Sequence, residues 1–256
     1  MNSLIVSNSI WADGQGFITL NCSEFTRAYR PGQLIMLQVA SGGTDPLLKR
    51  PFAPYFTDDS GNFGILYQVV GRGTKLLARA REGDILKVGL PHGRPFSLKQ
   101  NKKVALVAGG IGLAPMHCLA LALLNNGNDV SLYYGARNEA LIYPPAKTST
   151  SGIKWVFTTD DGSFGKLGFA TTYLKEDILS FDSCYATGPG PMMQAVHRLC
   201  KAHEIPLEVS LEEVMACGIG ACGGCMVKTK KDDLISMKRC CTEGPVFRSD
   251  EVYHED

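Results

Sequence analysis

The sequence predicts a multi-domain protein. An antiparallel β-barrel comes first, then an α/β domain with a parallel sheet, and then a small cysteine-rich domain. Three observations along its 256 residues predict this order. Short β-rich runs fill the region before Lys103, strand and helix patterns alternate from there onwards, and glycine and cysteine gather after Pro206. We therefore expect the domains at residues 1–98, 99–205 and 206–256.

The first predicted domain alternates short strands with turn residues. Its β-rich runs cover residues 18–22, 33–39, 63–69 and 84–88. Short strands at regular spacing, bounded by turn residues, are typical of an antiparallel barrel or sandwich.

The second predicted domain alternates strands with helices. Strands are expected at residues 104–108, 130–134, 154–158 and 184–187, and helices at 114–125, from 171 and at 191–201. This alternation indicates a parallel sheet covered by helices. The uncharged run 104–124 is long enough to imitate a membrane span. Its glycines and Pro115 divide it into strand, turn and helix, so we expect no membrane segment.

Composition excludes several classes of protein. The net charge of +1 comes without a basic stripe, which argues against a nucleic-acid partner. The start of the chain lacks a cationic segment followed by a long apolar run, so we expect no secretory signal and a cytoplasmic location. Nine cysteines are too few for a disulfide scaffold in a chain of this length. Five of them lie within residues 217–241, which points to a reducing compartment and a metal centre.

Three cysteines have the C-x4-C-x2-C spacing that is typical of a two-iron, two-sulfur (2Fe-2S) cluster: Cys217, Cys222 and Cys225. A fourth thiolate must come from Cys240 or Cys241. Neighbouring residues of an extended chain point in opposite directions, so we expect only one of this pair to bind. A structural zinc site or disulfides are the alternatives. Against zinc, only Cys222 and Cys225 form the short hook that zinc sites use in pairs.

Glycines accompany both the cysteines and the start of the α/β domain. Gly218, Gly220, Gly223 and Gly224 are expected to adopt positive φ and to direct amide N–H groups at sulfur. In the α/β domain a glycine-rich turn stands where a strand meets a helix, as a phosphate-binding turn does. A close crossing of helix and strand is the alternative for this turn. Its candidate residues are Gly109, Gly110, Gly112, Ala114 and Pro115.

Two further groups are expected to have structural roles. Ser210 and Glu213 have the spacing of a capping box, so Glu212 and Glu213 are expected near the start of a short helix. The five histidines are scattered without the spacing of a catalytic pair or a metal site. No arrangement of side chains suggests a nucleophile.

The order of domains resembles the ferredoxin–NADP reductase superfamily. Within it, the chain resembles the family of electron-transfer subunits of NAD-dependent dihydroorotate dehydrogenase. The likeness runs nearly end to end. It is most specific at residues 216–225, A-C-G-I-G-A-C-G-G-C, and 241–247, C-T-E-G-P-V-F. The resemblance implies that Cys241 is the fourth cluster ligand, together with Cys217, Cys222 and Cys225.

The resemblance also implies that the barrel binds FAD. Arg50, Pro51, Phe52 and Ala53 look like the family's R-P-x-S stretch, in which the arginine meets a flavin phosphate; Ala53 stands where the family has serine. A second flavin segment has its glycine and threonine against the pyrophosphate, at the start of a helix expected at residues 75–80. Its counterparts here are Leu66, Tyr67, Gln68, Gly73 and Thr74.

A nicotinamide nucleotide is implied beside the glycine-rich turn. Three more segments match those that flank it in the superfamily: 134–137 with Arg137, 159–165 with Asp161, and 187–193 with Gly188 and Pro189. Thr187 replaces the cysteine of the superfamily's C-G-P. NADH is preferred over NADPH by likeness alone, because Arg137 can meet either a ribose or a 2′-phosphate.

These cofactors predict an electron-transfer protein. Nicotinamide exchanges a hydride, a cluster carries single electrons, and a flavin does both, so FAD should stand between NAD(H) and the cluster. The resemblance implies a partner, the FMN-containing dihydroorotate dehydrogenase catalytic subunit, in a heterotetramer of two copies each that serves pyrimidine biosynthesis. The alternative is a related FAD/iron–sulfur NAD(P)H oxidoreductase subunit of the sulfhydrogenase or transhydrogenase type.

Overall fold

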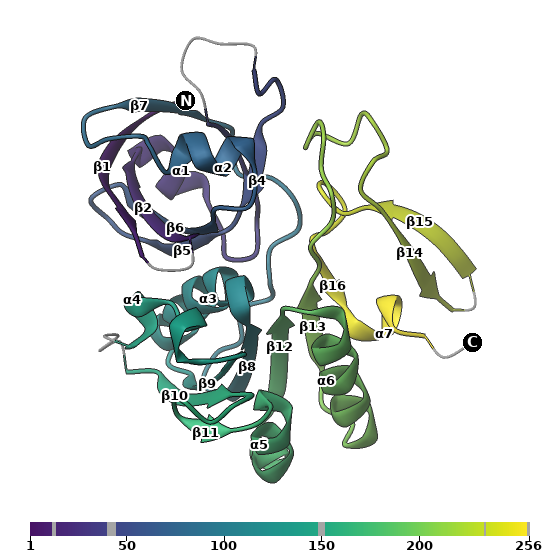
Figure 1. The fold of residues 1–256 in the computed structure, drawn as a ribbon. Coiled ribbons are helices and arrows are strands. Elements are labelled where there is room, and N and C mark those ends of the chain that lie inside the picture. The colour runs from purple at the N-terminus through teal and green to yellow at the C-terminus, as the bar shows by residue number, and fades with distance from the viewer. Residues whose placement is uncertain (12–13, 40–44, 148–151, 233, 255–256) are drawn as a thin grey trace.

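The chain folds into a β-barrel, a parallel α/β unit and a C-terminal segment that contacts both of them (Figure 1). The computed structural model describes residues 1–11, 14–39, 45–147, 152–232 and 234–254. The predicted fold class is confirmed, and the division at residues 98/99 and 205/206 stays a prediction. Within the described residues, no helix is both long and apolar enough to cross a membrane.

The barrel is a seven-stranded antiparallel sheet that nearly closes on itself. Its strands run in the order β4 (Arg50–Phe52), β3 (Ile35–Gln38), β7 (Ile85–Val88), β1 (Asn2–Ile10), β2 (Gln15–Asn21), β6 (Asn62–Gln68) and β5 (Pro54–Thr57). The two edge strands, β4 and β5, are separated in sequence by Ala53 alone, so this residue joins the two edges of the sheet. Two short helices, α1 (Ser23–Ala28) and α2 (Arg72–Leu77), complete the barrel.

The α/β unit is a second seven-stranded sheet. Its order is β11 (Lys166–Leu167), β10 (Lys154–Thr159), β9 (Asp129–Ala136), β8 (Lys103–Gly109), β12 (Ser183–Thr187), β13 (Leu207–Ser210) and β16 (Val246–Arg248). All neighbours are parallel except β13 and β16, which are antiparallel. Thus two segments that follow residue 205 extend this sheet.

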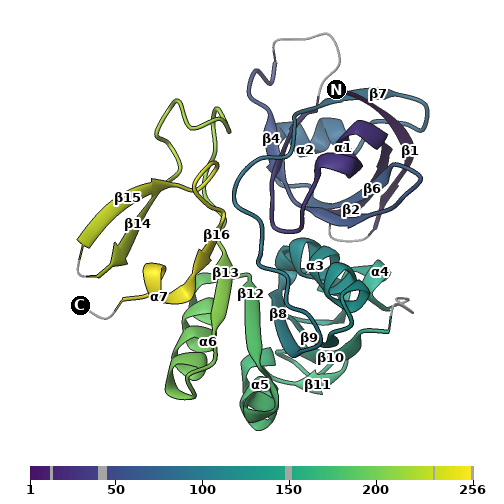
Figure 2. The same cartoon turned by 180° about the vertical axis from the view of Figure 1, so that it is seen from behind.

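Helices cover both faces of the parallel sheet. Alternate residues of β8 belong to the cores on opposite faces of the sheet. Val104 and Leu106 pack with α3 (Leu113–Asn125), whereas Ala105 and Val107 pack with α5 (Ala170–Asp177) and α6 (Gly190–Ala202). Shorter helical segments are α4 (Pro144–Lys147), η2 (Gly110–Gly112), η3 (Glu139–Leu141) and η4 (Ile178–Ser180). Seen from behind, α3 lies between the sheet and the barrel (Figure 2).

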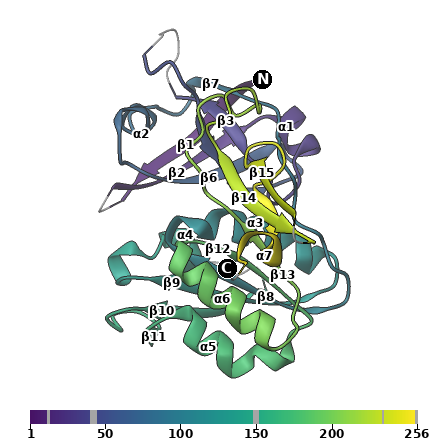
Figure 3. The ribbon, with the colours of Figure 1, turned by 90° about the vertical axis from the view of Figure 1, so that its right-hand side faces the viewer.

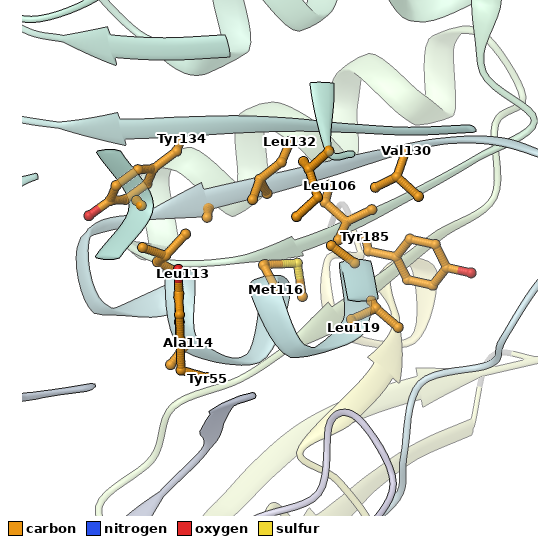
Figure 4. Packing of buried hydrophobic residues seen from close by; sticks show 14 of the residues in the cluster. Tyr55, Leu106, Leu113, Ala114, Met116, Leu119, Val130, Leu132, Tyr134 and Tyr185 are labelled. Carbon is orange, nitrogen blue, oxygen red and sulfur yellow. The ribbon is translucent and has the colours of Figure 1, made fainter. Parts of the chain in front are cut away.

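Helix α3 joins the barrel to the α/β unit. Tyr55 of β5 stacks on His117 of α3, with ring centroids 3.9 Å apart, and His117 Nδ1–H donates to the Tyr55 carbonyl oxygen at 2.9 Å. Burial lowers the pKa of His117 to about 4, so the ring is neutral at physiological pH. Tyr55 belongs to the same apolar cluster as Leu106 and Met116 (Figure 4). One continuous core therefore spans both units and fixes how they face each other.

The C-terminal segment forms a hairpin of β14 (Met226–Lys231) and β15 (Leu234–Arg239), and a last helical turn, α7 (Ser249–Val252). The sequence predicts this hairpin through Asp232 and Asp233; Asp233 lies outside the described residues. The short helix expected near Ser210 is wrong, because residues 211–215 leave β13 as non-helical chain. Figure 1 shows this segment alongside the barrel and the sheet, and in Figure 3 it faces the viewer.

Candidate functional site

A cavity of about 400 Å³ lies where the barrel, the α/β unit and the segment after β13 meet. Its volume is within the range of small-molecule sites. The predicted residues that line it are Arg50, Pro51, Phe52, Ala53, Leu66, Tyr67, Gln68, Gly73, Thr74, Ala114 and Pro115. The cavity thus gathers the whole predicted flavin set from two distant parts of the barrel.

Arg50 and the start of α2 form the barrel side of this cavity. A Cβ atom added to Gly73 would lie 2.7 Å from Arg50 Nε, so glycine leaves room for the guanidinium group. Thr74 Oγ1 accepts hydrogen bonds from the amides of Val70 (3.0 Å) and Gly71 (3.2 Å). The helix begins at Arg72 rather than at residue 75, which places Gly73 and Thr74 within its first turn. A cationic side chain packed over a glycine in the first turn of a helix fits a phosphate-bearing cofactor.

Three other side chains of the cavity wall offer little free hydrogen-bonding capacity. The Tyr67 hydroxyl donates to Asn8 Oδ1 at 2.8 Å, and its ring packs against Gly16 inside the barrel. Thr187 Oγ1 donates to the Ala186 carbonyl oxygen at 2.9 Å, and Ala53 has no hydroxyl. The wall near these residues is therefore mainly a surface for packing.

The predicted nucleotide residues lie at the carboxyl ends of strands of the parallel sheet. Gly109 ends β8, whereas Arg137, Asp161 and Gly188 follow the carboxyl ends of β9, β10 and β12. The chain order reverses between β8 and β12, and ligands of open α/β sheets bind at such a point. The residues of this set that do not line the cavity are Gly109, Gly110, Gly112, Arg137, Asp161, Gly188 and Pro189.

Two glycines of the turn are required for packing. A Cβ atom on Gly112 would collide with the Thr187 carbonyl oxygen, and one on Gly109 would lie 2.6 Å from Pro189 Cδ. A close crossing of helix and strand, the alternative to a phosphate-binding turn, is therefore sufficient to explain why glycine stands at these two positions. Gly110 differs, because its φ is +54° and no atom lies within 4 Å of an added Cβ. This residue leaves the backbone open at the edge where a nucleotide would approach.

Asp161 stands at the same edge with an ordered carboxylate. Its Oδ1 accepts from Ser163 Oγ at 2.6 Å and from the Ser163 amide at 3.0 Å. These hydrogen bonds keep the pKa of Asp161 below its ordinary value, so the group is ionised at neutral pH.

The loop that follows the cavity segment carries the first cysteine pair. The Cys222 amide donates to Cys217 Sγ at 3.4 Å, and the amides of Ile219 and Cys222 lower the pKa of Cys217 to about 6. Hydrogen bonds to sulfur favour the thiolate, which is the form that binds metal. Gly218, Gly220 and Gly223 have φ values of +69°, +80° and +64°; the expectation of positive φ at Gly224 is wrong.

The neighbouring cysteines at the end of β15 direct their thiols differently. Burial and a hydrogen bond with the Cys225 thiol raise the pKa of Cys241, which places these two sulfurs together. Cys240 Sγ instead donates to the Leu211 carbonyl oxygen at 3.5 Å, and burial raises its pKa to about 12. Both residues lie in a turn rather than in an extended strand, so the turn separates their thiols.

The four predicted ligands form two pairs, Cys217 with Cys222 and Cys225 with Cys241. Across the described ranges, no three His, Cys, Asp or Glu side chains converge as one metal ion requires. A structural zinc ion needs four donors around a single point, whereas a 2Fe-2S cluster has two iron atoms for its four thiolates. The donor set therefore fits the cluster better than it fits zinc.

The cysteine loop packs directly against the barrel. A Cβ atom on Gly218 would lie 2.6 Å from the Met36 side chain, and Met36 of β3 is paired in register with Pro51 of β4. Pro51 lines the cavity. Gly218, Met36 and Pro51 thus form a short packed connection between the cysteine loop and the cavity.

Sequence reasoning missed the segment between β13 and the cysteine loop. Ser210, Leu211, Glu212, Glu213 and Met215 all line the cavity. The capping-box spacing obscured this role, because it also describes the start of a helix.

Comparison with known proteins identifies both later units. Residues 212–253 match the family model described as the iron-sulfur cluster binding domain of dihydroorotate dehydrogenase B. Residues 106–198 match the model described as the oxidoreductase NAD-binding domain.

Solved structures share the fold over most or nearly all of the chain. One described as an NADH-dependent reduced ferredoxin-NADP oxidoreductase, studied for flavin-based electron bifurcation, has a TM-score of 0.84 and 30% identity; the match covers 98% of this chain and 89% of the other. A ferredoxin NADP+ reductase from Neisseria gonorrhoeae with bound FAD and NADP shares the fold. Its TM-score is 0.62 at 15% identity, covering 79% of this chain and 90% of the other.

Two relatives with higher identity are both described as "Dihydroorotate dehydrogenase B (NAD(+)), electron transfer subunit". That of Caldanaerobacter subterraneus subsp. tengcongensis is 40% identical over 222 residues, which cover 87% of this chain and 86% of the relative. That of Geobacillus thermodenitrificans is 35% identical over 252 residues, covering 97% and 96%. The chain therefore belongs to the family of electron transfer subunits of NAD+-dependent dihydroorotate dehydrogenase B.

Proposed function

We propose that this chain carries electrons between an FMN-containing catalytic subunit, which oxidises dihydroorotate to orotate, and NAD+. A 2Fe-2S cluster and FAD connect the two. The observation that carries the proposal is the packed connection from the cysteine loop through Gly218 and Met36 to Pro51 at the cavity. A one-electron carrier and a flavin site in direct contact are what conversion between single electrons and hydride requires.

Each cofactor has its own set of residues. Cys217, Cys222, Cys225 and Cys241 hold the cluster, whose chemistry is single-electron exchange. The barrel set around Arg50 and Gly73 holds FAD, with the arginine on a phosphate. The edge of the parallel sheet, from Gly109 to Pro189, holds NAD(H). The Asp161 carboxylate at that edge suits a ribose hydroxyl and disfavours a 2′-phosphate, which supports NADH over NADPH.

The partner subunit docks, in this proposal, on the face that carries the cysteine loop. Val214, just before that loop, and Ile219 within it are 86% and 74% exposed, and the neighbouring hairpin exposes Leu234, Ile235 and Met237. Exposed apolar groups in one region favour a protein interface. In this proposal the assembly is a heterotetramer with two copies of each subunit. Nine free cysteines and the cluster favour the cytoplasm as the location.

A spectrum and a reconstitution test the proposal. The purified chain should show flavin and cluster absorption, and NADH should bleach both. It should not turn over dihydroorotate alone, because in this proposal the carbon chemistry takes place in the FMN-containing subunit. Adding the FMN-bearing subunit should start NAD+-dependent oxidation of dihydroorotate. Turnover by the chain alone would contradict the proposal.

One structural relative favours a second candidate. The NADH-dependent ferredoxin-NADP oxidoreductase aligns over 98% of this chain at 30% identity. If NADH bleached the flavin but no dihydroorotate dehydrogenase partner restored turnover, a transhydrogenase-type subunit would replace the first proposal.

A further inference from the structure

Asn8 of β1 uses both ends of its side-chain amide in hydrogen bonds. Its Nδ2 group donates to the carbonyl oxygens of Leu77 and Ala80, both at 2.9 Å. Its Oδ1 atom accepts a hydrogen bond from the Tyr67 hydroxyl at 2.8 Å. The reversed amide would direct an oxygen atom at two carbonyl oxygens, so these partners allow a single orientation. Asn8 therefore holds together two other elements of the barrel, β6 and the end of α2.

These two elements carry separate parts of the predicted flavin set. Tyr67 belongs to β6 and lines the cavity. Helix α2 contributes Gly73, which lines the cavity where it lies against the guanidinium group of Arg50. Asn8 is not part of the cavity wall. Any influence of Asn8 on a bound cofactor must therefore pass through β6 and α2.

Helix α2 depends on hydrogen bonds at both of its ends. It has six residues, fewer than an isolated helix needs to be stable in water. At its start, Thr74 Oγ1 accepts hydrogen bonds from the amides of Val70 and Gly71. At its other end, where carbonyl groups lack donors within the helix, Asn8 supplies the donors. The position of Gly73 is thus secured from both sides.

We propose that Asn8 is a positioning residue for the flavin. Because it binds Tyr67 and the end of α2 at the same time, it fixes the β6 wall of the cavity relative to the helical turn that places Gly73 beside Arg50. A cofactor then meets a site whose two parts are already arranged, and its binding costs less ordering of the protein. This inference rests on the proposed function, which assigns the cavity to FAD.

Replacement of Asn8 by aspartate tests this role with little change of shape. Asn8→Asp keeps an acceptor for Tyr67 but removes both donors, and it places a negative charge at a helix C-terminus, where anions are unfavourable. The dissociation constant of FAD, measured by flavin fluorescence on the full chain with its cluster, should rise at least about tenfold, the effect of losing two ordinary hydrogen bonds. Tyr67→Phe removes only the third hydrogen bond, so its rise should be smaller.

Asn21 of β2 provides a matched control. Its Nδ2 group also donates two hydrogen bonds, to the Ser60 carbonyl oxygen at 3.1 Å and to Asn62 Oδ1 at 2.8 Å. Asn62 begins β6, whereas Tyr67 lies near its end. Asn21→Asp should therefore leave the dissociation constant of FAD unchanged, even where it lowers the unfolding temperature as much as Asn8→Asp does.

Combination with Arg50→Ala separates positioning from a general loss of stability. If Asn8 acts by holding Gly73 beside Arg50, Asn8→Asp should weaken FAD binding little further once the guanidinium group is gone. A change that only destabilises the barrel would instead weaken binding by the same factor in both backgrounds.

Three results would overturn the inference: an unchanged dissociation constant in Asn8→Asp, an equal rise in Asn21→Asp, or equal factors with and without Arg50. If Asn8→Asp fails to fold, Tyr67→Phe decides, because an unchanged constant in that variant also overturns the role of Asn8. A wild-type chain that binds no FAD would instead count against the proposed function, so the two failures are distinguishable.

Discussion

Among single residues, Cys240 and Cys241 show how adjacent identical side chains acquire different chemistry. The turn after β15 directs one thiol to the Leu211 carbonyl oxygen in the core and the other to the Cys225 thiol. Cys241 Sγ therefore lies beside the sulfur of another predicted ligand, whereas Cys240 Sγ is engaged by a backbone carbonyl group. Position in the fold, rather than residue type, separates their roles.

We predict that replacing Cys241 with serine abolishes cluster binding, whereas Cys240→Ser retains it. Serine at position 240 keeps a hydrogen-bond donor for Leu211, so it is the matched control. Iron and sulfide per chain, measured after anaerobic reconstitution, provide the readout. Loss of the cluster in Cys240→Ser with retention in Cys241→Ser would reverse the assignment.

Arg50 is predicted to hold the flavin through a phosphate group. Hydrogen bonds to charged groups contribute about 1.5–3 kcal/mol, so Arg50→Ala should weaken FAD retention by roughly that amount. FAD occupancy after extensive dialysis measures the change. Lys49→Ala removes an exposed charge next in sequence and should leave occupancy unaltered. Equal occupancy in both variants would refute the role of Arg50.

At the level of elements, the position of the cysteine loop depends on its packing contact with β3. Gly218 and Gly223 both have positive φ, but only Gly218 lies against a neighbour, Met36. The two positions therefore share the same backbone requirement and differ in packing.

Alanine substitutions at these two glycines therefore form a matched pair that tests the packing contact. Both Gly218→Ala and Gly223→Ala should cost about 1–2 kcal/mol, because an L-residue is strained in the left-handed region. Gly218→Ala must also displace Met36, so it should release iron to a chelator faster than Gly223→Ala and slow cluster reduction by NADH. Equal rates in the two variants would show that the contact with Met36 has no effect.

At the scale of the whole molecule, the cavity exists only because three segments are held together. The Tyr55–His117 stack and the core around α3 fix the barrel on the sheet, and β13 and β16 bring the C-terminal segment to the same place. The cysteine loop then presents its exposed apolar residues outward, where a partner can cover them.

Ile219→Asp should weaken assembly with the FMN-bearing subunit. Burying one such side chain contributes about 1.5–3 kcal/mol, and each 1.4 kcal/mol is about tenfold in affinity. Dissociation constants from sedimentation should therefore rise at least about tenfold, with cluster content unchanged. Leu179→Asp, at an 80% exposed position in η4, is the control. Equal effects of both variants would place the interface elsewhere.

The sequence alone determined what local pattern can encode. The strands around residues 18–22, 104–108 and 184–187 and the helices at 114–125 and 191–201 are present as expected, because periodicity and turn residues act over a few neighbours. The cysteine spacing and the R-P-F-A stretch likewise named candidate cofactor residues before any packing was known.

Only the tertiary structure decided what depends on distant contacts. The short strands β4 and β5 have no pattern of their own and form because β4 pairs with β3 and β5 pairs with β6. Glu212 joins the cavity instead of capping a helix, because β13 pairs with β12 and β16 and carries the following residues to the barrel. Spacing in sequence cannot encode such placements, since they arise from pairing and burial between segments far apart in the chain.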